Sequence, residues 1–123
     1  MSRTIDDKRA NQKGRLDGQA IFTSWDTRLV CEESGILSFG LEKFPAFRRS
    51  LWLFPEQNSV EICFDDGRFF HGFSSIMPKA EHLCGADIYQ VVYVFAGHEW
   101  QSHWAVKGPH KNYEMTTHYT RAA

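Results

Sequence analysis

From Gly14 onward, apolar and polar residues alternate with a period of two, and this pattern constrains the fold more than any other feature. Turn-forming clusters of Gly, Pro, Asn or Asp separate most of eight alternating runs, which cover about 14–24, 27–39, 45–54, 59–65, 68–74, 86–95, 98–107 and 112–121. Short strands with regular turn signals and no helix between them are typical of antiparallel sandwiches and barrels. A chain of 123 residues fits one domain. We therefore predict an all-β domain over residues 14–123, a single up-and-down antiparallel β-barrel of about eight strands, preceded by residues 1–13 as a short helix or a flexible segment.

Turn signals at 66–67, 96–97 and 108–111 set the registers of the predicted hairpins. The Asp66-Gly67 dipeptide is the strongest of them, because a type I′ turn needs positive φ at both central positions. The resulting pairs are Phe64 with Phe69, Ile62 with His71, Tyr93 with Trp100, Tyr89 with Trp104, Val106 with Tyr113, Trp104 with Met115 and Ser102 with Thr117. One inner face follows: Val60, Ile62, Phe64, Phe69, His71, Phe73, Asp87, Tyr89, Val91, Tyr93, Trp100, Ser102, Trp104, Val106, Tyr113, Met115, Thr117, Tyr119 and Arg121.

The polar groups on this inner face predict an internal cavity. Aromatic residues make up 15% of the chain, yet Tyr, Ser, Thr, His and Arg alternate with them on the same face. Each buried polar group without a partner costs about 1–3 kcal/mol, and a lumen that holds water or a ligand removes this cost. About eight strands close into a barrel just wide enough for one small ligand, as in lipocalins. The alternative is a small filled barrel whose Tyr hydroxyls bond one another and the backbone.

Composition excludes several classes of protein. The formal net charge of -1, from 14 basic and 15 acidic residues, provides no general attraction for nucleic acid or anionic membranes. Cys31, Cys63 and Cys84 are too widely spaced for a zinc knuckle or a disulfide framework, so we expect reduced thiols. We find no apolar signal-peptide core and no 18-residue apolar window, and therefore expect a cytoplasmic protein. No nucleophile elbow, phosphate-binding glycine loop or nucleotide fingerprint is present, so no cofactor is expected.

We expect one end of the barrel to form the mouth of the cavity. It gathers the turns near Trp25, 55–58 and 108–111 and the long connection 75–85, and it presents Lys79, His82, Cys84, Asp87, Lys111 and Tyr113. The turns at 66–67 and 96–97 lie at the closed end, together with Trp100 and Arg121. Arg121 either pairs a ligand carboxylate with the help of Tyr119, or stacks on Trp100 and seals the floor.

Two groups of residues are candidates for chemistry. His82, Cys84 and Asp87 are the densest set of potential metal ligands, but Asp87 has the opposite strand parity to the other two, so we predict an ordinary polar loop and no metal site. His71 is a candidate general base, metal or haem ligand, or hydrogen-bond donor to a ligand, and otherwise a satisfied core residue. The full candidate ligand-binding set is His71, His82, Cys84, Asp87, Tyr89, Tyr93, Trp104, Lys111, Tyr113, Thr117, Tyr119 and Arg121.

Three motifs together resemble a known family. They are Phe64-x-Asp66-Gly67-Arg68-x-Phe70-His71, then His82-x-Cys84-Gly85-x-Asp87-x-Tyr89, then Trp104-x-Val106-x-Gly108-Pro109-x-Lys111-x-Tyr113-x-x-x-Thr117-x-Tyr119-x-Arg121. They are similar to a bacterial family of uncharacterised proteins, catalogued as a domain of unknown function and described as calycin-like, that is, related in shape to lipocalins and fatty-acid-binding proteins. The resemblance covers residues 14–121. It implies a fold, and it carries no established activity or ligand.

These observations lead us to expect a small-molecule-binding barrel that holds an apolar or amphipathic ligand. Its polar end would be oriented by His71, Asp87 and the tyrosines, with Lys111 or Arg121 as a further candidate. One alternative is an enzyme that uses the same cavity for acid/base or isomerase chemistry, with His71 as the base. The other is a filled barrel that acts as a protein-interaction module, for example as a homodimer.

Overall fold

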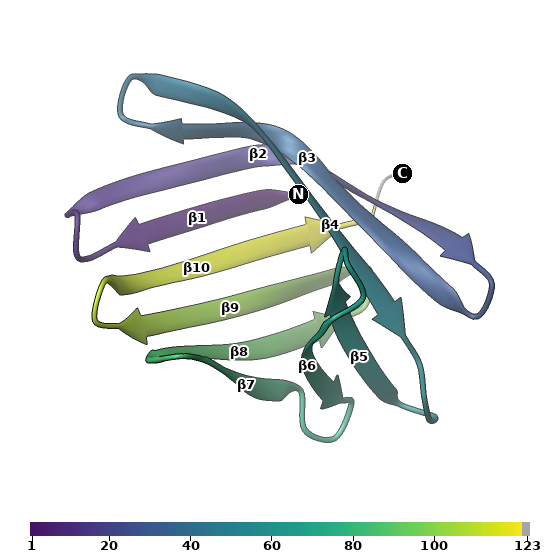
Figure 1. The fold of residues 1–123 in the computed structure, drawn as a ribbon. Coiled ribbons are helices and arrows are strands. Elements are labelled where there is room, and N and C mark those ends of the chain that lie inside the picture. Colours follow the sequence, from purple (N-terminus) through teal and green to yellow (C-terminus); the bar gives the residue numbers. More distant parts are fainter. Residues whose placement is uncertain (122–123) are drawn as a thin grey trace.

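The computed structural model, which describes residues 1–121, is a nearly closed antiparallel barrel built from one sheet (Figure 1). Its strands are β1 (Ser2–Asp7), β2 (Gln12–Trp25), β3 (Arg28–Phe39), β4 (Glu42–Leu53), β5 (Ser59–Phe64), β6 (Phe69–Ser74), β7 (Lys79–Cys84), β8 (Asp87–Ala96), β9 (Glu99–Gly108) and β10 (Lys111–Thr120). The strand order is β6-β5-β4-β3-β2-β1-β10-β9-β8-β7. The up-and-down barrel is therefore confirmed, with ten strands in place of about eight and no helix among the described residues.

The prediction of a short helix or flexible segment over residues 1–13 was wrong. Strand β1 pairs along its whole length with both β2 and β10, and so joins the two ends of the chain within the sheet. The amino group of Met1 also donates to the carbonyl oxygen of Gly18 at 2.7 Å. Strand β1 carries one large apolar residue, Ile5, so its alternation is a weak signal. Its order comes from the hairpin with β2 and from β10, whose residues lie more than 100 positions away in the chain. Residues 122 and 123, which the predicted domain included, lie outside the described residues.

Strand β7 was also missed, because residues 75–85 were interpreted as a connection. Ala80 and His82 are partly buried and alternate with exposed residues, and Gly85, with a φ of +61°, begins a two-residue turn into β8. Relative to the predicted barrel, this extra strand reverses the direction of every strand that follows it in the chain. The turns at 66–67, 85–86 and 109–110 therefore share one end of the barrel, here called the Asp66 end, and the turn at 97–98 lies with both chain termini at the other, the terminal end.

The predicted hairpin registers were correct for β9 with β10, where Trp104 pairs with Met115. For β8 with β9 the turn is Gly97-His98, so Tyr93 pairs with Ser102, two residues from the predicted partner. A shift of two residues leaves each side chain on its predicted face, because the strand repeat is also two.

A bulge in the β5–β6 hairpin reverses two of the predicted orientations. Ile62 pairs with His71 as predicted, but Cys63 pairs with Phe69, which leaves Phe70 as the extra residue. A bulge of one residue moves the flanking side chains to the opposite face. Phe69, predicted to point inward, is 57% exposed, and Phe70 packs inside against Trp104 with ring centroids 5.2 Å apart.

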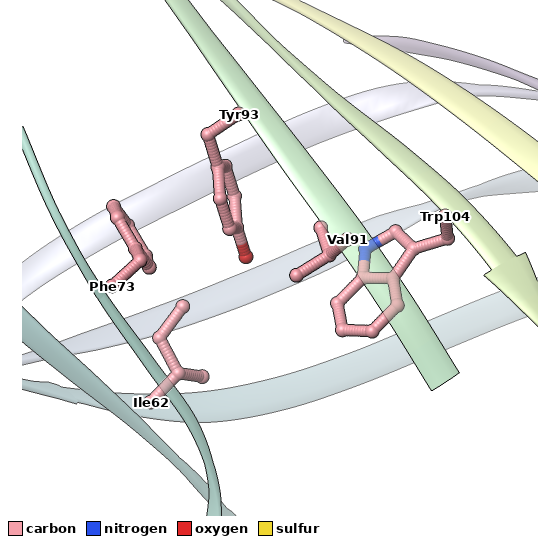
Figure 2. Close-up of a cluster of buried hydrophobic side chains, with 5 residues drawn as sticks. All are labelled: Ile62, Phe73, Val91, Tyr93 and Trp104. Carbon is pink, nitrogen blue, oxygen red and sulfur yellow. The ribbon is translucent and has the colours of Figure 1, made fainter. Parts of the chain in front are cut away.

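Side chains hold the barrel together at the seam between β6 and β7, which are the two edges of the sheet. The main core cluster crosses this seam and consists of Ile62, Phe73, Val91, Tyr93 and Trp104 (Figure 2). Phe73 and Tyr93 stack with their ring centroids 4.1 Å apart. The core thus lies between β5 and β6 on one side and β8 and β9 on the other, next to the cavity described below.

Candidate functional site

The barrel contains a partly open cavity of about 220 Å³. Its walls come from the inward faces of β3 to β6 and β8 to β10, and most of its large side chains are aromatic. The lining residues are Cys31, Glu33, Arg48, Arg49, Ser50, Trp52, Ile62, Cys63, Phe64, Phe70, His71, Tyr89, Tyr93, Trp100, Ser102, Trp104, Val106, Tyr113, Met115 and Tyr119. The interior is therefore a lined cavity and not a fully packed core.

The structure brings six of the twelve candidate residues together on this lining. They are His71, Tyr89, Tyr93, Trp104, Tyr113 and Tyr119. His82, Cys84, Asp87 and Lys111 lie nearer the Asp66 end and are outside the lining. Thr117 is fully buried behind the cavity wall, and Arg121 is exposed at the terminal end.

A buried charge network, which sequence reasoning missed, supplies the polar side of the cavity. The Nη2 atoms of Arg3 and Arg48 each lie 2.9 Å from Oε1 of Glu33. The hydroxyl of Tyr119 donates to the other oxygen of Glu33, and Nε of Arg3 donates to the Thr117 hydroxyl at 2.8 Å. Arg3 and Glu33 are 8% and 5% exposed, so this network is part of the barrel interior.

The charges of this network persist at neutral pH. Burial would raise the pKa of Glu33, but Arg48, Arg3 and the Tyr119 hydroxyl outweigh it and hold that pKa below its usual value. Burial opposes the charge of Arg48, but Glu33 outweighs it and raises the pKa of the guanidinium. Burial raises the pKa of the Tyr119 hydroxyl, and Glu33 adds to the effect, so Tyr119 stays a neutral donor.

One turn signal would have revealed half of this network. Gly40, with a φ of +58°, begins a two-residue turn that pairs Phe39 with Glu42 and therefore Glu33 with Arg48. Opposite charges directly across an antiparallel pair favour each other. Arg3 lacked such a signal, because residues 1–13 were interpreted as outside the barrel.

His71 lies in the cavity wall at the seam. Its Nε2 atom lies 2.8 Å from the hydroxyl of Tyr93 on β8, while the buried Nδ1 atom has no hydrogen-bond partner among the described residues. Burial, followed by the charge of Arg48, lowers the pKa of His71 to about 4. A general base works best with a pKa near the operating pH. His71 is therefore neutral at pH 7 and poorly suited to the role of base.

The Asp66 end holds the remaining polar candidates in a separate group. Nζ of Lys111 donates to the Tyr89 hydroxyl at 2.7 Å and lies 3.3 Å from Oδ2 of Asp87. Hydrogen bonds to these two groups raise the pKa of Lys111. His82 packs edge-on against the ring of Phe70, at a centroid distance of 5.0 Å. Lys79, expected here, begins β7 and lies toward the opposite end.

No group of three or more His, Cys, Asp or Glu residues within the described part of the chain is placed to hold a metal ion. His82 and Asp87 point to different neighbours, the first to aromatic rings and the second to Lys111. Cys84 is exposed, and all three cysteines are free thiols.

At the terminal end, Trp100 stacks on Tyr119 and not on Arg121. The two rings are nearly parallel, with centroids 3.7 Å apart. Arg121 is exposed, and its backbone N–H donates to the carbonyl oxygen of His98 at 3.2 Å. Arg121 borders a second, open hollow outside the barrel, whose lining also includes Trp100 and Tyr119.

The fold and the site define a small antiparallel β-barrel with a ring-lined internal cavity and a buried charge network. The chain belongs to a family of unknown function (DUF6314), which matches residues 1–121. No curated protein and no solved structure matched the chain. Among the described residues, no helix has the length and apolar character needed to cross a membrane.

Proposed function

We propose that this protein is a calycin-like barrel that binds one small apolar or amphipathic molecule in the internal cavity. The observation that carries the proposal is the cavity itself, in which aromatic walls meet a cluster of buried polar and charged side chains. Ligand sites in proteins commonly combine apolar walls with a few well-placed polar groups. Pockets for drug-sized ligands span about 300–1,000 Å³, so a cavity of about 220 Å³ suits a smaller molecule.

Ring contacts alone supply only part of the affinity. A ligand ring as large as a Phe or Tyr side chain buries about 150–250 Å², which corresponds to about 4–6 kcal/mol at about 25 cal/mol per Å². The loss of freedom on association costs roughly 4–15 kcal/mol. An apolar ring therefore binds weakly, and a ligand with a polar end that reaches the charged side of the cavity binds more tightly.

Native mass spectrometry of freshly purified protein, followed by titration with small aromatic and aliphatic compounds, tests the proposal. Ser102 lines the cavity and is buried, so Ser102→Leu fills space that a ligand needs. The matched control is Gln101→Leu on the outer face of β9, which is not part of the lining.

We expect a bound mass or a saturable titration that Ser102→Leu abolishes and Gln101→Leu preserves, with both variants folded by circular dichroism. Binding that is unchanged in Ser102→Leu would place the ligand elsewhere. The absence of any bound mass and of any titration response would contradict the proposed function.

A second candidate function, self-association, is favoured by one observation on the outside of the barrel. Leu83, Ile88, Val92 and Val94 are exposed on the outer face of β7 and β8, and Leu83 pairs directly with Ile88. An apolar patch of this kind marks protein interfaces. Light scattering across a concentration range tests it: a dimer that Val92→Lys dissociates supports self-association, and a monomer at all concentrations contradicts it.

The cytoplasmic location expected from the sequence stays a prediction.

A further inference from the structure

The buried network carries one more positive charge than negative charge. Arg3 and Arg48 share the single carboxylate of Glu33. Burial raises the pKa of Cys31 to about 12 and also raises the pKa values of Tyr93 and Tyr119, so these groups stay neutral. The other arginine on the lining, Arg49, is paired with Asp65 at 3.2 Å. The described lining therefore leaves one positive charge uncompensated.

Arg48 is the member of the network that is open to a ligand. Its guanidinium has five N–H donors, and Nη2 forms an ion pair with Glu33. Its side chain keeps 47% of its surface accessible, and it borders both the ring-lined cavity and a neighbouring cavity of about 190 Å³. Arg3, in contrast, is engaged by Glu33, Thr117 and Tyr119.

Arg48 is half-exposed, so water screens its charge in the empty cavity, but a ligand that covers the guanidinium removes this water and must supply an opposite charge in its place. A ligand that brings one negative charge restores the balance, whereas a neutral ligand leaves the charge unpaired. A phosphate monoester brings about -1.5 to -2 charges at pH 7 and exceeds the surplus. A carboxylate brings one charge, and its two oxygens match the planar fork of a guanidinium.

We propose that the natural ligand is a small monocarboxylate with an aromatic or similarly apolar body, whose carboxylate pairs with Arg48 while its body packs among the rings of the cavity. This inference rests on the proposed function and names the class of ligand that the cavity selects. The apolar body lies beside Trp52, Trp104 and Phe70 on the lining. The other arginine on the described lining, Arg49, has Asp65 as a partner of its own, whereas Arg48 shares Glu33 with Arg3.

The experiment compares phenylacetate with its neutral isostere phenylacetamide and with phenyl phosphate, by isothermal titration calorimetry at constant ionic strength. We expect phenylacetate to bind about 10- to 100-fold more tightly than phenylacetamide, the ratio for a charge-assisted pair inside a protein. This comparison uses the unmodified protein, so it does not depend on whether a variant folds.

Two variants then locate the carboxylate. Arg48→Met removes the surplus charge and leaves Glu33 paired with Arg3, and we expect it to lose the 10- to 100-fold preference for phenylacetate while it keeps its affinity for phenylacetamide. The control is Arg15→Met, since Arg15 is exposed, pairs with Asp17 and does not line the cavity. It should bind all probes like the unmodified protein.

The outcomes separate this inference from the proposed function. Equal affinity for phenylacetate and phenylacetamide, tighter binding of phenyl phosphate, or an Arg48→Met variant that retains the preference would overturn the monocarboxylate inference and leave a small-molecule-binding barrel. If none of the three probes binds and native mass spectrometry shows no bound mass, both the inference and the proposed function fail.

Discussion

Trp100 and Tyr119 stack face to face with their ring planes 4° apart, and both residues line the internal cavity as well as the open hollow at the terminal end. The stacked pair thus forms the wall between the two spaces. The Tyr119 hydroxyl is at the same time held by Glu33, so the charge network fixes the position of one ring and, through it, of the other.

Removing the Trp100 ring should join the cavity to the open hollow at the terminal end and so give a ligand a second way out. We expect Trp100→Ala to destabilise the protein by up to about 3 kcal/mol, the lower end for loss of a buried aromatic ring, and to speed ligand release measured by stopped-flow displacement. Trp25→Ala is the control, because Trp25 is 55% exposed, contacts the guanidinium of Arg28 and is not part of the cavity lining. Equal release rates in the two variants would show that Trp100 is not a barrier.

Because of the bulge in β6, we expect the two adjacent phenylalanines, Phe69 and Phe70, to contribute very differently to stability. Phe70→Ala removes one ring that stacks on both Trp104 and Phe64, so we expect the free energy of unfolding in urea to fall by about 3 kcal/mol. Phe69→Ala removes a mostly exposed ring and should cost less than about 1 kcal/mol. The reverse order of the two losses would mean that the hairpin has the two-residue loop and no bulge.

The buried network predicts a non-additive pair of substitutions. Glu33→Gln leaves the guanidinium groups of Arg3 and Arg48 without a counter-charge, and we expect a loss of about 3–5 kcal/mol. Arg48→Met alone should be nearly neutral, because it leaves one balanced ion pair. Adding Arg48→Met to Glu33→Gln should recover part of the loss, and a double-mutant cycle by chemical denaturation measures the coupling. Strict additivity would show that the two side chains do not interact.

Because His71 is buried, we expect the free energy of unfolding to fall in mild acid. The pKa of its imidazole is 6.5 in an exposed setting and about 4 in the folded protein, so the unfolded chain binds more protons between these values. The contribution of His71 to the free energy of unfolding should therefore decrease as the pH falls from about 6.5 to about 4, by about 3 kcal/mol in total, and stay constant at lower pH, where protonation of Glu33 lowers the stability further.

Urea unfolding between pH 4 and pH 7 measures this decrease. His71→Gln keeps a partner for the Tyr93 hydroxyl and has no titrating ring, so its profile should lack the decrease. His118→Gln, at an exposed position on β10, is the control and should retain it. A decrease of the same size in His71→Gln would assign the pH dependence to other groups.

The local pattern of apolar and polar residues was sufficient to predict the inner face of strands that are joined by a tight turn. The period-two alternation and the turn at 108–111 predicted the inner face of β8 to β10, and with it Tyr89, Tyr93, Trp104, Tyr113 and Tyr119 on the cavity wall. A register error of two residues at 97–98 did no harm to these assignments, since the faces of a strand also repeat every two residues.

The sequence by itself determined an all-β, up-and-down barrel with an aromatic interior, because alternation and tight turns are local properties. Only the tertiary structure decided that Arg3 and Thr117 join Glu33 in the charge network of the cavity. Arg3, Glu33 and Thr117 come from β1, β3 and β10, and Arg3 lies 114 residues from Thr117 along the chain. Strand β1 is completed by pairing with β10 at the other end of the chain, and the bulge that turns Phe70 inward is accompanied by packing against Trp104 on β9. Such long-range contacts leave no periodic signal in the sequence, because their energy depends on which strands closure of the barrel brings face to face.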